Sequence, residues 1–225
     1  VTWNIHGCVG RDGRHDVHRV GAAIRTLEPD IAALQEVDTR RKTPGQPEVQ
    51  DYLREQVGDH GHTAWAITDE NGDYGQMLAS RYPLSDCHIH DISVAGREPR
   101  KVVEARIALP SGPLRVIATH LGLSRRERRR QIARLCDIVR DDLSVPVLLL
   151  GDFNEWRWRG PQLSGLFESG TRHLSFPSRF PVFALDRIYS HPTDLVVRSR
   201  IARDAHMASD HLPVIAELVL KKQDH

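Results

Sequence analysis

The chain has few of the features that mark a secreted or membrane-spanning protein. Its three cysteines, Cys8, Cys87 and Cys136, are odd in number and lack C-x-x-C spacing, so we expect neither a disulfide framework nor a structural zinc site. No apolar run approaches the roughly 20 residues that span a bilayer. The longest, at 145–150, has the length of a buried strand. A net charge of +1 argues against a general polycation but is compatible with a local basic patch.

What remains is an ordinary globular composition. Hydrophobic residues make up 40% and charged residues 27% of the 225 positions, and no repeat, low-complexity tract or linker divides them. We therefore expect one domain over residues 1–225, monomeric by default. The cysteine usage favours a reducing compartment, so we predict a cytoplasmic protein. Because the sequence begins at Val1 inside a strand-like run, we also expect that residues precede it.

Hydrophobic periodicity predicts a strand-rich chain. Short apolar runs predict strands at 1–5, 31–34, 63–67, 77–80, 102–109, 114–119, 145–150, 185–189, 195–201 and 212–220. Helical periods occur at 17–27, 52–57 and 132–139, and Ser124 with Glu127 has the pattern of a capping box before the last of these. A hairpin at 102–119 among helix-linked strands indicates two sheets packed face to face with helices outside, an α/β or α+β fold.

Polar residues that can bind metal or move protons follow these apolar runs by one or two positions. In chain order they are Asn4, His6, Gln35, Glu36, His120, Asp152, Asn154, Asp186, Ser209, Asp210 and His211. Each alone is explained as well by a turn, a cap or a solvated strand end. Strand ends at one edge of a sheet sandwich can, however, converge on one cleft. Carboxylate and amide oxygens there would suit Mg²⁺ or Mn²⁺ better than zinc.

Taken in order, the motifs resemble those of the endonuclease/exonuclease/phosphatase superfamily. They read Thr2-Trp3-Asn4-Ile5-His6-Gly7, Leu34-Gln35-Glu36, Thr119-His120-Leu121, Gly151-Asp152-Phe153-Asn154, Leu185-Asp186-Arg187-Ile188 and Ser209-Asp210-His211-Leu212-Pro213-Val214. The superfamily includes deoxyribonuclease I-like and exonuclease III-like nucleases, neutral sphingomyelinases and inositol-polyphosphate 5-phosphatases. The resemblance covers residues 2 to about 218 and implies a four-layer sandwich of two mixed β-sheets flanked by helices.

The resemblance also implies a metal site and a place for the phosphate. Glu36 would be the main ligand of a Mg²⁺ or Mn²⁺ ion, with Asn4 and Asp210 next to the ion or its waters. Asp152 and Asn154 would position the attacking water or contact the scissile phosphate.

Two histidines would complete the chemistry. Asp186 would orient His211, which would act as a base or as a transition-state stabiliser, because a carboxylate on one ring nitrogen fixes the tautomer. His120 would protonate the leaving oxygen, and its orienting carboxylate is expected within 70–75.

Basic and aromatic residues suggest substrate contacts. Arg125 and Arg126 stand in a first helical turn, where the helix dipole disfavours cations, so a phosphate ligand is one reason to place them there. Arg100 in a preceding loop is a second candidate phosphate contact. The alternative for both is a solvated surface. The run 175–181 carries two phenylalanines between prolines and is interpreted as core support near the cleft.

The residues together predict a divalent-metal-dependent phosphodiesterase, with a nuclease favoured and a nucleic acid as its partner. A phospholipid phosphodiesterase of the sphingomyelinase type and a phosphomonoesterase are the alternative activities. A catalytically inactive binding module is the alternative of another class, and it is disfavoured because every main position of the family pattern holds a competent residue.

Overall fold

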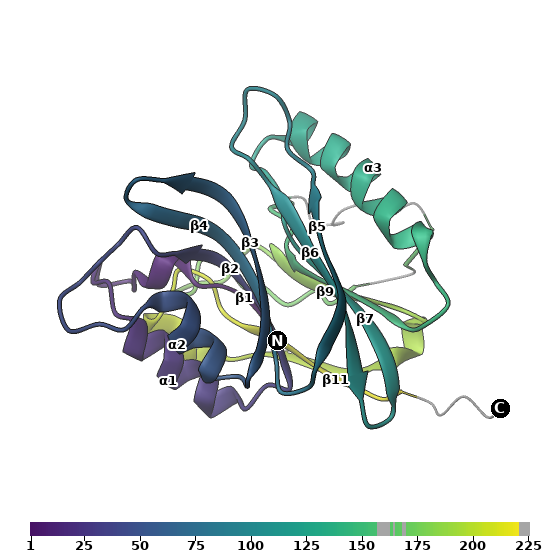
Figure 1. Cartoon of the computed structure of the whole chain (residues 1–225), viewed down its shortest axis with the longest axis horizontal. Helices are drawn as coiled ribbons and strands as arrows, with labels where there is room; N and C mark the ends of the chain where they lie inside the picture. Colours follow the sequence, from purple (N-terminus) through teal and green to yellow (C-terminus); the bar gives the residue numbers. More distant parts are fainter. Residues whose placement is uncertain (157–162, 164, 168–169, 221–225) are drawn as a thin grey trace.

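The structure is a computed structural model that describes residues 1–156, 163, 165–167 and 170–220. Two β-sheets pack face to face, with α1 and α2 beside one sheet and α3 along the other (Figure 1). Three α-helices occur among the described residues: α1 (Val17–Leu27), α2 (Val49–Glu55) and α3 (Arg125–Asp141). Short 3₁₀ turns are η1 (His6–Cys8), η2 (Thr193–Leu195) and η3 (Arg203–Met207).

The first sheet has six strands and joins both ends of the described chain. In spatial order they are β10 (Val196–Ile201), β11 (Val214–Leu218), β1 (Thr2–Asn4), β2 (Ile31–Asp38), β4 (Gly72–Ser80) and β3 (His60–Asp69). β1 runs parallel to β2 and antiparallel to β11. The motif that ends β1 is therefore brought next to the motif that precedes β11, although about 200 residues separate them in sequence.

The second sheet has five strands. They are β5 (Leu84–Asp91), β6 (Lys101–Leu109), β7 (Gly112–His120), β8 (Val147–Asp152) and β9 (Asp186–His191). β6 and β7 form the predicted antiparallel hairpin, and the α3 crossover makes β8 parallel to β7. In this register His120 lies opposite Asp152, and Asp152 lies opposite Asp186, so three polar side chains stand in one row across adjacent strands.

Three apolar layers hold the four structural layers together. Ile24 and Leu53 pack α1 and α2 onto Leu34 of β2. Between the sheets, Ala33 and Leu150 belong to a second buried cluster. A third cluster packs α3 on the outer face of the second sheet, and its members include Leu135, Val139, Leu149 and Phe153. Each fully buried Leu, Ile or Phe contributes roughly 1.5–3 kcal/mol. The predicted four-layer sandwich is thus confirmed.

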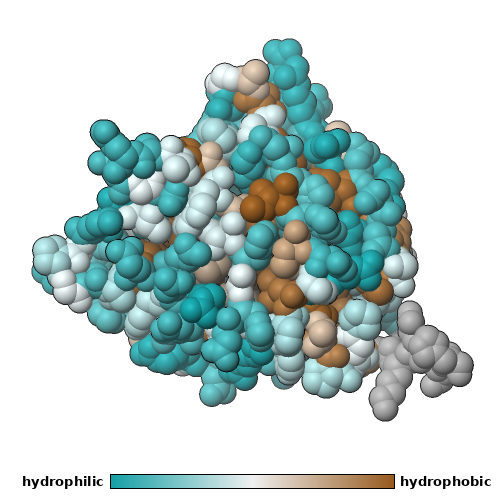
Figure 2. Space-filling model, viewed as in Figure 1, coloured by the Kyte–Doolittle hydropathy of each residue, from teal (hydrophilic) through white to brown (hydrophobic). Residues whose placement is uncertain are grey.

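One strand escaped prediction. β5 is an edge strand, and its sequence LSDCHIHD has no apolar run because most of its side chains are exposed. Charged and polar residues on an edge strand discourage pairing with another chain. On the face of the molecule drawn in Figure 2, hydrophilic atoms dominate and apolar atoms form small patches. No helix among the described residues is long and apolar enough to cross a membrane.

The predicted capping box is wrong. Ser124 is the N-cap residue of α3, but its side chain caps nothing. Glu127 is buried and accepts a hydrogen bond from Gln131 at 3.1 Å instead of reaching back to the cap. The Gln131 amide oxygen accepts from the Gly122 backbone N–H at 2.8 Å, so this side chain ties the helix to the segment that follows β7.

Candidate active site

Glu36 and Asn4 form the first half of the site, on neighbouring strands of the first sheet. A bulge interrupts the pairing of β2 with β4 between Gln35 and Val37, and Glu36 within it has a left-handed φ of 59°. Such strain in a non-glycine residue persists where the surroundings enforce it, often at functional sites. The Asn4 side-chain Nδ2 donates to Glu36 Oε1 at 2.8 Å and to Asp152 Oδ2 at 3.1 Å. The amide therefore joins two carboxylates, one from each sheet.

Asp152 is the centre of the second half. It ends β8 and is 1% exposed. The preceding Gly151 has φ of 152°, and a Cβ there would lie 1.9 Å from the Thr119 carbonyl oxygen, so this close approach of β7 and β8 requires glycine. The Asn154 backbone N–H donates to Asp152 Oδ1 at 2.8 Å, while Oδ2 faces Asn4, His120 and His211.

His120 approaches Asp152 from β7. Its Nε2 lies 3.7 Å from Asp152 Oδ2, and its Nδ1 lies 3.4 Å from Nη1 of Arg100. A guanidinium can only donate, so Nδ1 accepts and the ring proton resides on Nε2, pointing to the carboxylate. The expectation of an orienting carboxylate within 70–75 is therefore wrong. Arg100 holds that position, and its own charge is balanced by Glu98 at 2.6 Å.

His211 approaches the same oxygen from the first sheet. Its Nδ1 lies 2.7 Å from Oδ2 of Asp186, and its Nε2 lies 3.9 Å from Oδ2 of Asp152. The indole N–H of Trp3 donates to the His211 carbonyl at 3.0 Å. In addition, the Ser209 hydroxyl donates to the Asn4 carbonyl at 2.7 Å, so the loop that carries His211 is fixed to β1.

These environments push the pKa values of the site apart. Burial raises the pKa of Asp152 to about 6, and the nearby charge of Asp186 adds to the rise. Burial alone would lower the pKa of His211, but the charge and hydrogen bond of Asp186 outweigh it and raise this pKa to about 10. The pKa of His120 is held well below its usual value by burial, by Arg100 and by His211. At neutral pH the site thus combines the charged ring of His211, the neutral ring of His120 and the Asp152 carboxylate, whose pKa is close to neutral pH.

Negative charge exceeds positive charge around this cluster. Among the described residues, Asp152, Asp186 and His211 form the one group of three whose ligand atoms all lie within 4.8 Å of one another. Glu36 adds a third carboxylate through Asn4. A bound cation would reduce the cost of ionising these buried carboxylates. The carboxylate oxygens of this cluster therefore fit a hard divalent cation, whereas the protonated His211 ring offers no lone pair to it.

Comparison with known proteins places this geometry in a family. Residues 1–211 match the model of the Endonuclease/Exonuclease/phosphatase family. The chain belongs to this family. The uncharacterized protein YbhP of Escherichia coli K12 is 34% identical over 253 aligned residues, which cover 98% of this chain and 95% of that protein. The resemblance inferred from the motifs is confirmed.

Solved structures agree on the fold. A family member from Beutenbergia cavernae has a TM-score of 0.77 at 23% identity, covering 96% of this chain and 69% of that one. One from Bacteroides vulgatus has a TM-score of 0.77 at 17% identity, covering 98% and 97%. A mannosyl-6-phosphatase from Bacteroides thetaiotaomicron has a TM-score of 0.74 at 16% identity, covering 97% and 98%. At these identities the likeness establishes the family fold only.

Two family-motif residues lie in places that the sequence did not indicate. Asp210 is half-exposed, and its Oδ1 lies 3.8 Å from Nδ1 of His6, also at the rim of the site. The Asn154 side chain is buried and donates to the Leu121 carbonyl at 2.9 Å. Asn154 thereby fixes the turn after β8 to the end of β7, with a left-handed φ of 49°. In the structure, Asp210 is thus a polar group at the rim of the site, and Asn154 holds a strained turn in place.

The predicted substrate arginines divide into buried and exposed groups. Arg100 is buried in the site beside His120. Arg125 and Arg126 are exposed on the first turn of α3 and form no ion pair or hydrogen bond with any part of the chain that the structure describes. Arg128, in the same run, is buried, donates to the Leu123 carbonyl and lies 3.7 Å from Glu155. Its charge is used inside the protein, so Arg128 does not belong to the exposed basic surface.

Ser175 is the residue that sequence reasoning missed. It is fully buried, and its Oγ donates to Asp186 Oδ2 at 2.6 Å. The run 175–181 was interpreted as core support, yet its Phe176 ring lies 4.8 Å from the His211 ring, centroid to centroid. A serine ahead of an aromatic residue in a proline-bounded loop was the only available signal, and it is a weak one.

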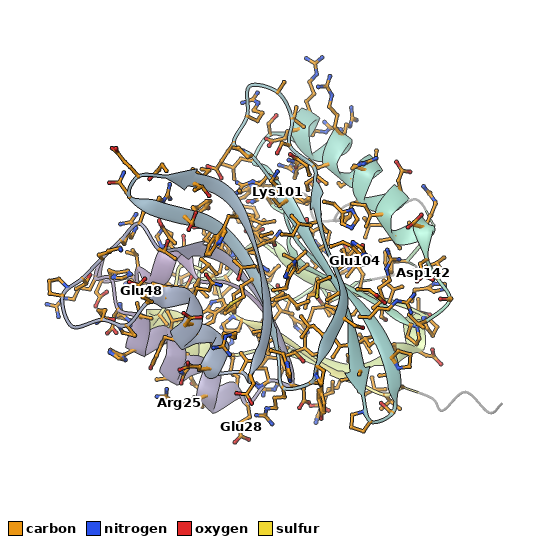
Figure 3. The ribbon with its side chains drawn as sticks, viewed as in Figure 1. Arg25, Glu28, Glu48, Lys101, Glu104 and Asp142 are labelled. Atoms are coloured by element: carbon orange, nitrogen blue, oxygen red, sulfur yellow. The ribbon has the colours of Figure 1, made fainter. Side chains whose placement is uncertain are left out.

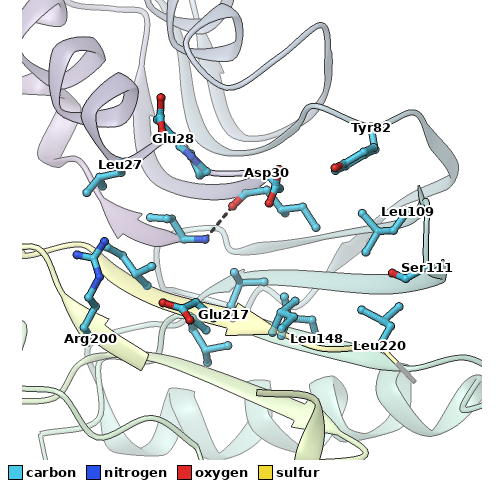
Figure 4. A pocket seen from close by; sticks show the side chains of 18 of the residues that line it. Leu27, Glu28, Asp30, Tyr82, Leu109, Ser111, Leu148, Arg200, Glu217 and Leu220 are labelled. Atoms are coloured by element: carbon cyan, nitrogen blue, oxygen red, sulfur yellow. Dashed lines mark hydrogen bonds between the residues drawn. The ribbon is translucent and has the colours of Figure 1, made fainter. Parts of the chain in front are cut away.

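A cavity of about 480 Å³ lies away from this chemistry (Figure 4). Its lining includes Ile31 at the start of β2, Ser111 before β7 and Leu148 near the start of β8. The Asp152 cluster is at the opposite ends of those strands. The cavity is lined by aliphatic and charged side chains and by no histidine, so the Asp152 cluster is the better candidate for the active site.

Proposed function

We propose that the chain hydrolyses phosphodiesters with the help of a divalent metal ion, acting as one domain over residues 1–225. The observation that carries this proposal is the convergence of three polar groups on a single buried oxygen. Asn4 Nδ2, His120 Nε2 and His211 Nε2 lie 3.1, 3.7 and 3.9 Å from Asp152 Oδ2. Two imidazoles above a carboxylate can hold a tetrahedral phosphoryl group and an attacking water at once.

The separated pKa values suggest a division of roles. Asp152, with a pKa of about 6, is ionised at neutral pH and would take a proton from the attacking water. His211, charged at neutral pH because Asp186 stabilises its imidazolium, would offset charge on the phosphoryl oxygens. His120 is neutral with its proton on Nε2, so we assign it a hydrogen bond to the phosphoryl group rather than the role of an acid.

Glu36, with Asn4 and Asp210, would hold a Mg²⁺ or Mn²⁺ ion. The Asp152, Asp186 and His211 group is a poorer choice, because Asp186 Oδ2 already accepts two hydrogen bonds and a protonated His211 offers no lone pair. When bound, the ion would supply Lewis-acid stabilisation of negative charge on the phosphoryl group. Asn4 would keep the Glu36 carboxylate oriented, since its Nδ2 donates to Oε1.

A nucleic acid is the favoured substrate. The N-terminal end of α3 lies beside the loop between β5 and β6 (Figure 1). A groove between the two is lined by Ser93 and Ala95 on the loop side and by Arg130 and Arg134 on the helix side. Together with the exposed Arg125, these side chains could contact phosphates flanking the scissile one, which a polymer provides.

Two other substrates share the same chemistry. A phosphomonoester is one of them, because a mannosyl-6-phosphatase has a similar fold. A phospholipid would use the same phosphoryl contacts and fewer of the arginines. An inactive binding module is the least favoured, because the His–Asp pair and the Asn4 bridge retain the geometry that hydrolysis needs.

Hydrolysis by the purified chain, with Mg²⁺ or Mn²⁺ and after chelation, tests this proposal. The substrates should be plasmid DNA, RNA, sphingomyelin, mannose 6-phosphate and bis-p-nitrophenyl phosphate. We expect cleavage of nucleic acid and of the bis-ester, loss of both with excess chelator and recovery with Mn²⁺. Glu36→Gln should require more metal for half-maximal rate, whereas Glu217→Gln on β11 should behave as the parent. Full activity in excess chelator, or no hydrolysis of any substrate with metal present, would contradict the proposal.

A further inference from the structure

The segment from Ser175 to Ser178 forms several hydrogen bonds with the loop that carries His211. The Ser175 carbonyl accepts from the Leu212 backbone N–H at 2.8 Å. Three residues later, the Ser178 N–H donates to the Asp210 carbonyl at 2.7 Å, and its hydroxyl donates to the Ser209 carbonyl at 2.8 Å. These contacts tie both sides of the loop to one short segment, which is itself held by a backbone bond from Ser175 N–H to the Phe183 carbonyl at 2.8 Å.

The hydroxyl of Ser175 has one orientation available to it. Its Oγ lies 2.6 Å from Asp186 Oδ2 and 3.3 Å from the Asp186 backbone N. Because the backbone N–H must donate to Oγ, the hydroxyl proton is directed to the carboxylate. Ser175 is fully buried, so no solvent competes for that bond. A short hydrogen bond to an ionised acceptor is about twice as strong as one between neutral groups.

The same carboxylate oxygen serves the histidine. Asp186 Oδ2 accepts from Ser175 Oγ and from His211 Nδ1, at 2.6 and 2.7 Å, while the buried Oδ1 has no hydrogen-bond partner among the described residues. Nothing on the Oδ1 side therefore sets the rotation of the carboxylate about its χ2 bond. The serine hydroxyl is what selects the oxygen that faces His211 and fixes the plane in which it accepts.

We propose that Ser175 is a positioning residue for catalysis, acting through Asp186 on the orientation of His211. This inference rests on the proposed function for its catalytic consequence, but the hydrogen-bond chain exists without it. Ser175 touches neither the phosphoryl group nor the attacking water. Its loss should therefore lower the rate of the chemical step and leave substrate binding nearly unchanged.

Ser175→Ala tests the proposal, with Ser190→Ala as the matched control. Ser190 is a buried serine on the same strand as Asp186, and within the described part of the chain its hydroxyl has one hydrogen bond, to the Thr193 carbonyl at 3.4 Å. With bis-p-nitrophenyl phosphate and Mn²⁺, we expect Ser175→Ala to lower kcat by between about 10- and 100-fold, as for other residues that orient a catalytic group. KM should stay within about twofold of the parent value. Ser190→Ala should change neither.

A second measurement separates this inference from the proposed function. In metal-free buffer, the proton resonance of the His211 Nδ1–H should be sharp and downfield in the parent and in Ser190→Ala. It should broaden or move upfield in Ser175→Ala, with the thermal midpoint showing that this variant is folded. An unchanged resonance, or an unchanged kcat, in folded Ser175→Ala would overturn the inference. If the parent hydrolyses no substrate, the proposed function fails, and the resonance alone decides whether Ser175 orients the His–Asp pair.

Discussion

Replacing Asp152 with asparagine should stabilise the fold at neutral pH while removing activity. Burial and the charge of Asp186 raise the pKa of Asp152 to about 6, above the ordinary 3.8. The folded state therefore binds this proton more tightly than the unfolded state does. Above pH 6 the ionised carboxylate lowers the free energy of unfolding, and below pH 3.8, the pKa of the unfolded state, this destabilisation vanishes. At about 1.4 kcal/mol per pH unit the full cost is up to about 3 kcal/mol.

Urea unfolding of the parent and Asp152→Asn at pH 4 and pH 7, with a chelator present, measures this cost. The introduced amide has a single acceptor oxygen and cannot accept the hydrogen bonds of both Asn4 and Asn154, which costs about 1 kcal/mol at either pH. The change between the two pH values isolates the charge. We expect the free energy of unfolding of the variant, relative to that of the parent, to rise by about 2–3 kcal/mol between pH 4 and pH 7. We also expect kcat to fall by at least about 100-fold. An exposed aspartate variant, Asp141→Asn, should gain nothing. A stability difference that does not grow with pH would refute the reasoning.

Three further outcomes are expected. The double substitution Arg125→Ala and Arg126→Ala should raise KM for DNA, with bis-p-nitrophenyl phosphate turnover unchanged. The slope of log affinity for DNA against log salt concentration should fall by about one per lost phosphate contact. If the double variant cleaves DNA as well as the parent at every salt concentration, the two arginines are solvated surface only. Arg115→Met should lower the free energy of unfolding by about 3–5 kcal/mol in urea titrations, because it removes the guanidinium from the buried Glu104, which keeps only its contact with His90, and from the carbonyl of Val139. Arg100→Met should raise the pKa of His120 in NMR titrations, because it removes the adjacent cation; an unchanged pKa would contradict the role given to that arginine.

The central strands β2 and β8 were predictable because both of their faces are buried. β2 and β8 are covered by a helix layer on one side and by the other sheet on the opposite side, so residues 31–34 of β2 and 147–151 of β8 are all apolar or glycine. β5 was not predictable, because an edge strand with exposed side chains leaves no hydrophobic period to detect. The row of candidate site residues was predictable as a set of strand ends, since register alone places His120, Asp152 and Asp186 side by side.

Charged side chains mark the limit of the sequence reasoning. Arg115 is 2% exposed: it donates to Glu104 at 2.6 Å and to carbonyl groups at the end of α3, which stabilises that helix terminus. Figure 3 labels Glu104 on β6 and Asp142 just beyond α3, the two ends of this network. Neither this arginine nor Arg100 differs in local sequence from a surface arginine. Glu104, which pairs with Arg115, and His120, which Arg100 contacts, lie 11 and 20 residues away on other elements, and only packing reveals these contacts.

The site spans the gap between the two sheets, so the apolar layer there acts as a spacer that sets the catalytic distances. Asn4 on β1 and His211 in the loop before β11 are on the side of the first sheet, while Asp152 and Asp186 belong to the second, and two hydrogen bonds of 3.1 and 2.7 Å cross between them. Close-packed interiors respond to the loss of a single methylene group, and misplacement of a reacting group by about 1 Å can cost about 100-fold in rate. We therefore expect a change at a residue such as Leu150, which packs between the sheets and is not itself a site residue, to alter the turnover rate.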